Sequence, residues 1–157
     1  MVVLDNTILS NLARVGRADL IGQLWAETAC TTVAVMKEHA AAVESGVHPQ
    51  GSWAGLFVTE LTEEEEVTRA ALPPRLGQGE RACIAVARHR KGVLVTDDLD
   101  ARKTATRMEV AVTGTVGVLV LCVQQGLISL GEGNDLLKRM IDGTYRAPVD
   151  RLDGLLP

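Results

Sequence analysis

Short apolar runs alternate along the chain with longer stretches in which apolar residues recur every three or four positions. The runs predict strands, and the longer stretches predict helices with one apolar side. We expect strands over residues 2–5, 56–59, 93–96 and 110–113. We expect helices over residues 7–15, 18–25, 62–71, 79–91, 99–108, 114–124 and 132–141, and another that begins after Thr31 or Thr32. Strands that alternate with helices indicate a three-layer α/β/α fold with a central parallel sheet of four to five strands.

The chain shows no internal repeat, no low-complexity segment and no linker. Its 157 residues are the length of one domain, and a hydrophobic content of 46% is ample for a single core. Because aromatic residues make up only 3%, that core must consist mainly of Ala, Val, Leu and Ile. We expect a domain over residues 1–142 and an irregular C-terminal tail over residues 143–157.

The distribution of apolar and cysteine residues bears on the compartment. The most apolar window, residues 110–123, is too short for a bilayer, which needs roughly 20 apolar residues. Asp5 and Asn6 interrupt the first apolar run, so no signal peptide is expected. The three cysteines lie far apart in apolar stretches, and no pair has the spacing of a zinc site. We therefore expect a cytoplasmic protein with reduced core cysteines and no membrane association.

Acidic residues stand where apolar runs end or helices begin. Asp5 closes the first predicted strand, and Asp97 and Asp98 follow a later one. Since ligands of an open parallel sheet lie outside the carboxyl ends of its strands, these carboxylates can converge there, joined by Glu38 and Glu80 from helices. Clustered carboxylates repel each other unless a divalent cation neutralises them, and oxygen ligands suit Mg²⁺ or Mn²⁺. The pattern favours a metal-dependent enzyme of phosphate chemistry.

Each of these features also has a purely structural interpretation. Asp5 could cap the following helix, and Glu80 could be a first-turn glutamate favoured by the helix dipole. Glu38 could be an ordinary exposed helix residue. The glutamates at positions 63–66 are interpreted as a solvated helix start. The three histidines show no ligand spacing, so we expect them at the surface or in loops.

The order of the motifs is more specific than any one of them. Asp5-Asn6-Thr7 after a strand, Glu38 in a helix, Gly79-Glu80 opening another helix and the run Val-Thr-Asp-Asp-Leu-Asp at 95–100 follow one another. In this order the chain resembles the PIN-domain nucleases, the fold of VapC-type toxin ribonucleases, over nearly its whole length. It is especially similar to a prokaryotic PIN subfamily with the C-terminal pattern Val-Thr-Gly-Thr-Val-Gly-Val-Leu, here residues 112–119.

The resemblance implies roles for these residues. The positions that match the family's acids would be catalytic and would bind the metals of an acidic two-metal site: Asp5, Glu38, Glu80 and Asp98. Asp100 would bind a second metal or support a ligand residue. The supporting positions would be Asn6, Thr7 and Thr96. Asn6 stands where relatives often carry Thr, and Glu80 where many carry Asp, but neither change removes an oxygen ligand.

Asp97 and Asp98 compete for the same role. Successive side chains at a strand end point to opposite sides, so both cannot face one metal in the same way. The spacing from Thr96 in the family pattern selects Asp98 as the inward ligand. We expect Asp97 to cap the following helix instead.

The resemblance also implies the substrate and the partners. It implies cleavage of RNA to a 5′-phosphate and a 3′-hydroxyl, a homodimer and, for a toxin, a small antitoxin that blocks the cleft. Arg102, Lys103 and Arg107 follow the acidic run on one helix and could contact RNA phosphates. The formal net charge of -4 is not the global footprint of a nucleic-acid binder. The scarcity of aromatic residues argues against base stacking as the main binding mode.

Three other functions compete with this one. An aspartyl-nucleophile phosphatase of the haloacid-dehalogenase type needs a second Asp where Thr7 stands. A receiver-like phosphoacceptor domain needs an acidic pair after the first strand and a Lys after a late strand, where this chain has Asp5-Asn6 and Thr113-Gly114. A catalytically inactive PIN-like module that binds RNA or a partner is compatible with the sequence.

Overall fold

The computed structural model describes residues 1–156. At its centre lies a sheet of five parallel strands in the order β3-β2-β1-β4-β5. The strands are β1 (Val2–Leu4), β2 (Ala29–Thr32), β3 (Leu56–Thr59), β4 (Val93–Val95) and β5 (Ala111–Thr113). The expected parallel sheet is confirmed. The hydrophobic pattern misses β2, because its sequence Ala-Cys-Thr-Thr is half polar.

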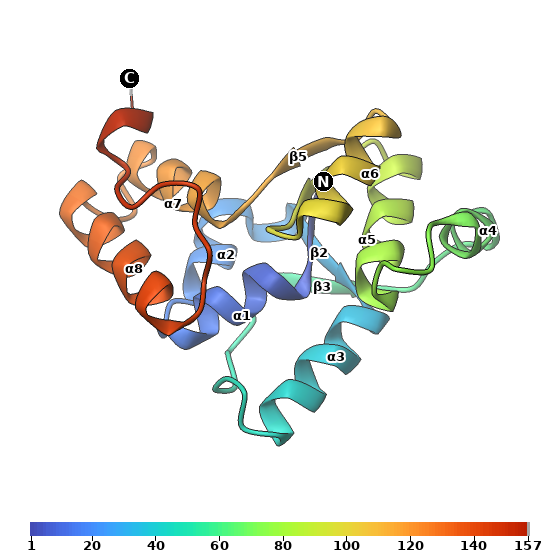
Figure 1. Ribbon diagram of the computed structural model, residues 1–157, viewed down its shortest axis with the longest axis horizontal. Coiled ribbons are helices and arrows are strands. Elements are labelled where there is room, and N and C mark those ends of the chain that lie inside the picture. The colour runs from blue at the N-terminus through green and yellow to red at the C-terminus, as the bar shows by residue number, and fades with distance from the viewer. Residues whose placement is uncertain (157) are drawn as a thin grey trace.

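Helices cover both faces of the sheet. They are α1 (Asn6–Arg14), α2 (Asp19–Trp25), α3 (Val33–Glu44), α4 (Glu63–Ala71), α5 (Gln78–His89), α6 (Leu99–Arg107), α7 (Thr115–Gln124) and α8 (Leu130–Gly143), with 3-10 turns at Ala26–Thr28 and Asp153–Leu155. Figure 1 shows α4, α5 and α6 to one side of the strands and α1, α2, α7 and α8 to the other, so the α/β/α layering is confirmed. No helix within residues 1–156 combines the length and the apolar character needed to cross a membrane.

Strand β1 is the point at which the strand order reverses. It pairs with β2 on one side, where Val3 aligns with Cys30, and with β4 on the other, where Val3 aligns with Leu94. In open parallel sheets the ligand crevice lies at such a reversal, outside the carboxyl ends of the strands. The residues that follow β1 and β4 therefore occupy the edge at which this fold type binds ligands.

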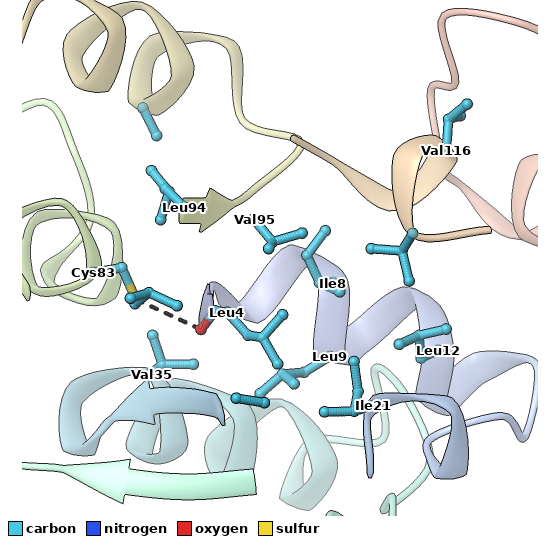
Figure 2. Close-up of a cluster of buried hydrophobic side chains, with 14 of the residues drawn as sticks. Leu4, Ile8, Leu9, Leu12, Ile21, Val35, Cys83, Leu94, Val95 and Val116 are labelled. Carbon is cyan, nitrogen blue, oxygen red and sulfur yellow. Dashed lines mark hydrogen bonds between the residues drawn. The ribbon is translucent and has the colours of Figure 1, made fainter. Parts of the chain in front are cut away.

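The core holds the end of β1 in place. Figure 2 shows Leu4 between Val35 and Cys83 on one side and helix α1 on the other. The Leu4 carbonyl accepts hydrogen bonds from the Thr31 hydroxyl at 2.7 Å and from the Cys83 thiol at 3.6 Å. The backbone immediately before Asp5 is thus fixed by neighbours from two other elements.

The cysteines are free and buried, as expected: Cys30, Cys83 and Cys122.

Two other expectations about polar residues are wrong. Glu65, in the glutamate run expected to be solvated, is 1% exposed and accepts a hydrogen bond from Arg90 at 2.6 Å. The Arg90 guanidinium lowers the pKa of Glu65, so the pair joins α4 to the end of α5.

His39, expected at the surface or in a loop, is instead buried on α3. His48 lies in the loop after α3, as expected, but its side chain is buried as well. The rings of His39 on α3 and His48 lie 4.4 Å apart between their centroids, and His39 also meets Trp53 edge to face. Burial, followed by the proximity of His48, lowers the pKa of His39 to about 4. His39 is therefore neutral at physiological pH, and its Nδ1 bonds Asn6 Oδ1 at 3.1 Å.

The segment after α8 is attached to the domain. Tyr145 and Leu152 are buried, and the Leu152 N–H donates to Asn134 Oδ1 on α8 at 2.8 Å. In Figure 1 this segment crosses α8 and runs on toward the C-terminus. Its first residues thereby reach the carboxyl edge of the sheet.

Candidate active site

Asp5 lies at the carboxyl end of β1 and is 2% exposed. Its Oδ2 accepts hydrogen bonds from the hydroxyls of Thr96 at 2.8 Å and Thr7 at 3.2 Å. Burial raises the pKa of Asp5, while these two hydrogen bonds act to lower it. Asp5 occupies the N-cap position of α1, yet its side chain forms no capping hydrogen bond to that helix. Helix capping therefore does not account for this carboxylate.

Thr96 connects Asp5 to Asp98. The Thr96 hydroxyl donates to Asp5 and accepts the backbone N–H of Asp98 at 3.2 Å. Asp98 is also the N-cap of α6, because its Oδ1 accepts the Ala101 N–H at 2.7 Å. The prediction that Asp97 caps this helix is wrong. The second oxygen of Asp98 has no hydrogen-bond donor within residues 1–156.

Asp97 instead binds the start of α7. This helix follows β5, the strand that pairs with β4 on the side away from β1. Its Oδ1 accepts the Thr115 N–H at 2.9 Å and the Tyr145 hydroxyl at 3.0 Å. Its Oδ2 accepts the Thr115 hydroxyl at 2.5 Å and the Asn11 amide at 3.1 Å. Burial and the Asp97 charge raise the pKa of Tyr145, which keeps the phenol protonated as a donor. Asp97 therefore joins α1, β4, α7 and the C-terminal segment.

Glu38 and Glu80 meet at the N-terminus of α5. Glu38 Oε1 on α3 accepts the Gly79 N–H at 2.8 Å, and Glu80 Oε2 accepts the Gly77 N–H at 2.8 Å. A Cβ atom built on Gly77 would lie 3.7 Å from Glu80 Oε2 and 3.9 Å from Glu38 Oε1, which places the two carboxylates beside one another. A Cβ on Gly79 would come within 2.6 Å of Glu38 Oε2, so the approach requires glycine there.

The electrostatics of Glu80 link all four carboxylates. Burial, together with the charges of Asp98, Asp5 and Glu38, raises the pKa of Glu80 to about 7, although the hydrogen bond from Gly77 acts to lower it. Asp5 in turn feels the charge of Glu38. The structure therefore brings together the four acids singled out from the sequence, which come from four different elements.

Comparison with known proteins agrees with this geometry. The family model described as a PIN domain matches residues 1–156. The chain belongs to the PIN-domain family. No curated protein and no solved structure gave a match. PIN domains are generally nucleases and typically use divalent metals.

We call the carboxylates of Asp5, Glu38, Glu80 and Asp98 the acidic group of this PIN domain. Their donor chemistry suits a hard divalent cation, since carboxylate oxygens are the ligands that Mg²⁺ and Mn²⁺ prefer. Within residues 1–156, no three Asp, Glu, His or Cys side chains are already close enough together to hold a metal ion. Glu38, Glu80 and Asp98 each direct one oxygen to a backbone N–H instead of toward a common centre.

The remaining acidic and amide candidates lie around this group. Asp100 is paired with Arg75 at 3.7 Å on the outer side of α6, and it is not among the charges that act on Glu80. Asn6 Oδ1 bonds His39, the residue next to Glu38. Asn6 thereby connects α1 to the helix that carries Glu38.

The three basic candidates on α6 have different environments. Arg102 is half-buried, and its Nη1 donates to the Thr96 carbonyl at 2.8 Å. Lys103 and Arg107 are exposed, and neither forms an ion pair in the described part of the chain. Only Arg102 is therefore tied to the strand end beside the acids of this PIN domain.

Several residues of the PIN-domain site escaped the sequence analysis. Asn11 is a polar residue amid the apolar face of α1, and that interruption is a usable signal for a buried polar contact. Thr115 lies within the C-terminal family pattern, but the pattern does not reveal its bond to Asp97. Tyr145 is the only tyrosine of the chain, and its position after the last helix gives no hint of its partner.

Proposed function

We propose that this protein is a metal-dependent endoribonuclease that hydrolyses RNA phosphodiester bonds at the Asp5, Glu38, Glu80 and Asp98 group. The observation that carries the proposal is the meeting of four carboxylates from four elements at the reversal point of the sheet. Carboxylates that repel each other in a half-buried place are costly for the fold. Their presence is explained when they serve to bind cations.

Bound Mg²⁺ or Mn²⁺ would supply an activated water and neutralise charge on the scissile phosphate. The protein's part is to hold the ligands. Thr7 and Thr96 fix the Asp5 carboxylate through two hydroxyls. The Gly79 and Gly77 amides orient Glu38 and Glu80 at the positive end of the α5 dipole. Since the pKa of Glu80 is raised to about 7, this carboxyl holds or releases a proton near neutral pH.

The competing functions fit these contacts less well. A phosphatase nucleophile must reach its substrate, whereas Asp5 is 2% exposed and one of its oxygens is occupied by two hydroxyls. A PIN-like module that binds RNA without cutting it would retain the fold. It would not need four mutually repelling carboxylates.

The test is RNA cleavage by wild type and Asp5→Asn, with chelator and with Mn²⁺ restored. We expect wild-type cleavage to stop on chelation and to return with Mn²⁺. Asp5→Asn should lose about 100-fold or more of the activity and still fold, because it removes a buried charge that the other acids repel. Asp142→Asn, which removes an exposed charge on α8, is the control and should cleave normally. Cleavage that survives exhaustive chelation, or full activity of Asp5→Asn, would refute the proposal.

We further propose that the protein acts in the cytoplasm as the toxin of a toxin–antitoxin pair, as a homodimer with a small antitoxin partner. The support is the sequence resemblance over the first residues and the pattern at 112–119. Induced expression should stop bacterial growth, and Asp5→Asn expression should not. Equal growth in both cultures would count against the toxin role and leave the nuclease activity untouched.

A further inference from the structure

A second pocket lies on the other side of the β4 end from the acidic group. Its volume is about 480 Å³, within the range of small-molecule and cofactor sites. Its walls come from α6, the start of α7 and the C-terminal segment, and include Leu99, Arg102, Gly114, Arg146 and Pro148. Neither the acidic group nor the proposed cation accounts for this pocket.

The charge of the pocket favours an anion. Arg102 and Arg146 line it, and neither forms an ion pair within residues 1–156. The one carboxylate in its wall, Asp97, has both oxygens occupied by four donors. The N-terminus of α7, a helix of ten residues, adds partial positive charge.

A larger pocket of about 620 Å³ beside Glu38 has the opposite character. Its charged lining consists of Glu38, Glu60 and Glu66 against Lys37 and Arg69. Arg69 is already bound to Glu66 and to a glutamine. An incoming polyanion is therefore favoured on the arginine side of the acidic group and disfavoured on the glutamate side.

We propose that the pocket lined by Arg102 and Arg146 is an RNA subsite, which holds a backbone phosphate and its nucleotide next to the scissile phosphate. The inference rests on the proposed nuclease function. Arg102 is connected to the acidic group, because its Nη1 donates to the carbonyl of Thr96, whose hydroxyl binds Asp5. Its other N–H groups remain for a phosphate. The apolar Leu99, 69% exposed directly after Asp98, offers a surface for the sugar or base.

The C-terminal segment positions the second arginine. Tyr145, immediately before Arg146, is buried and donates its hydroxyl to Asp97 at 3.0 Å. This contact brings a segment from the end of the chain to the carboxyl edge of the sheet. Tyr145 is thus a positioning residue for the subsite, and it keeps an exposed arginine next to Arg102.

The test measures RNA binding apart from cleavage. A short fluorescent single-stranded RNA is titrated with Asp5→Asn protein in chelator, at several salt concentrations, by anisotropy. We expect Arg102→Ala and Arg146→Ala each to weaken binding several-fold. The logarithm of the association constant falls linearly with the logarithm of the salt concentration. Each variant should make this slope less negative by about 0.7, the value for one lost phosphate contact on a single strand. Arg88→Ala is the matched control, since Arg88 pairs with Glu109 at the far end of α5.

The outcomes separate this inference from the nuclease proposal. If wild-type protein cleaves RNA and both arginine variants bind with unchanged affinity and slope, the subsite is wrong and the nuclease function stands. If the variants lose binding as expected and no condition gives metal-dependent cleavage, Arg102 and Arg146 bind RNA, but the nuclease function and the place of the pocket beside a scissile phosphate are wrong. A loss in Arg88→Ala equal to that in Arg146→Ala would show unspecific charge attraction and overturn the subsite.

Discussion

Asp97 and Asp98 are neighbours in the chain and have opposite environments. All the hydrogen bonds that reach the Asp97 carboxylate come from fixed donors on α1, α7 and the C-terminal segment. Asp98 receives one backbone N–H on one oxygen, and its charge acts on Glu80 across the acidic group. Asp97 therefore joins elements of the fold, whereas Asp98 lies near the like charge of another acid.

The difference gives a criterion for function. A buried carboxylate whose oxygens are all occupied by donors is stabilised by the fold and contributes to it. A carboxylate whose charge acts on a neighbouring acid, as that of Asp98 acts on Glu80, raises the electrostatic energy of the apo protein, and a cation would lower it. By this criterion we expect Asp97 to be structural and Asp98 to be functional. The sequence predicts the same assignment, although its expectation that Asp97 caps α6 is wrong.

The largest effects are expected when Asp97 and Asp98 are neutralised separately. Asp98→Asn should lose about 100-fold or more of the metal-dependent cleavage and much of the Mn²⁺ affinity. Its stability should change little, because Asn caps helices about as well as Asp. Asp97→Asn should retain Mn²⁺ binding but lose roughly 2–3 kcal/mol of stability, since its new NH₂ would face the donors of Asn11 and Thr115.

Cleavage assays, Mn²⁺ calorimetry and urea unfolding of the two variants decide the matter. The two variants serve as controls for each other, since each removes one charge from adjacent positions. Loss of Mn²⁺ binding in a stable Asp97→Asn protein would show that the roles are exchanged.

The sequence predicted the fold well, because strands and helices leave different periodicities. Apolar runs of three or four residues marked four strands, and only β2, with two threonines, lacked that signal. Glu65 was missed for a different reason. A glutamate in the first turn of a helix is usually solvated, and its partner Arg90 is 25 residues away. Long-range pairs of this kind leave no local pattern.

The assignment at the end of β4 shows the limit more clearly. The alternation of side chains holds within a strand, but β4 ends at Val95 and positions 96–98 lie outside it. The alternation therefore could not tell which aspartate caps α6. The four acids were candidates because strand ends and a family pattern marked them. The donors that bind Asp97 were not, since Tyr145 reaches it across 48 positions of the sequence.

A smaller perturbation concerns the glycine that lets Glu38 reach α5. In Gly79→Ala the new Cβ would lie 2.6 Å from Glu38 Oε2 and 2.9 Å from Val35 Cγ2, so Glu38 must move away. We expect about tenfold weaker Mn²⁺ binding and a loss of about 1–3 kcal/mol in unfolding free energy. These losses should occur although alanine is the better helix former by about 1 kcal/mol.

Gly131→Ala is the control for Gly79→Ala. Gly131 lies in the first turn of α8, and the nearest atom to its added Cβ would be Ser129 Oγ at 3.8 Å. This variant should keep its Mn²⁺ affinity and be as stable as wild type or slightly more so. If Gly79→Ala behaves in the same way, Glu38 does not depend on its contact with α5.

The smallest expected effect is a pH dependence that only the acidic group should show. The pKa of Glu80 is raised to about 7 from an ordinary value of 4.5, so the folded protein binds this proton more tightly than the unfolded chain. The stability from this group is present below about pH 4.5 and is lost as the pH rises through about 7. His39, with a pKa lowered to about 4 from 6.5, has the opposite effect: its contribution to stability is complete well above pH 6.5 and is lost as the pH falls. This effect is the same in wild type and in a Glu80 variant, so the difference between the two proteins reports Glu80.

Thermal melts of the metal-free protein between pH 6.5 and 8 therefore isolate Glu80. Wild type should lose a few degrees of melting temperature across this range, and Glu80→Gln should lose less, because Gln carries no titrating proton and can still accept the Gly77 N–H. Mn²⁺ should raise the wild-type melting temperature more at pH 8 than at pH 6.5, since the cation competes with the proton for Glu80. The same slope in both proteins would mean that Glu80 does not titrate near neutral pH, and that the four carboxylates repel each other less than the structure indicates.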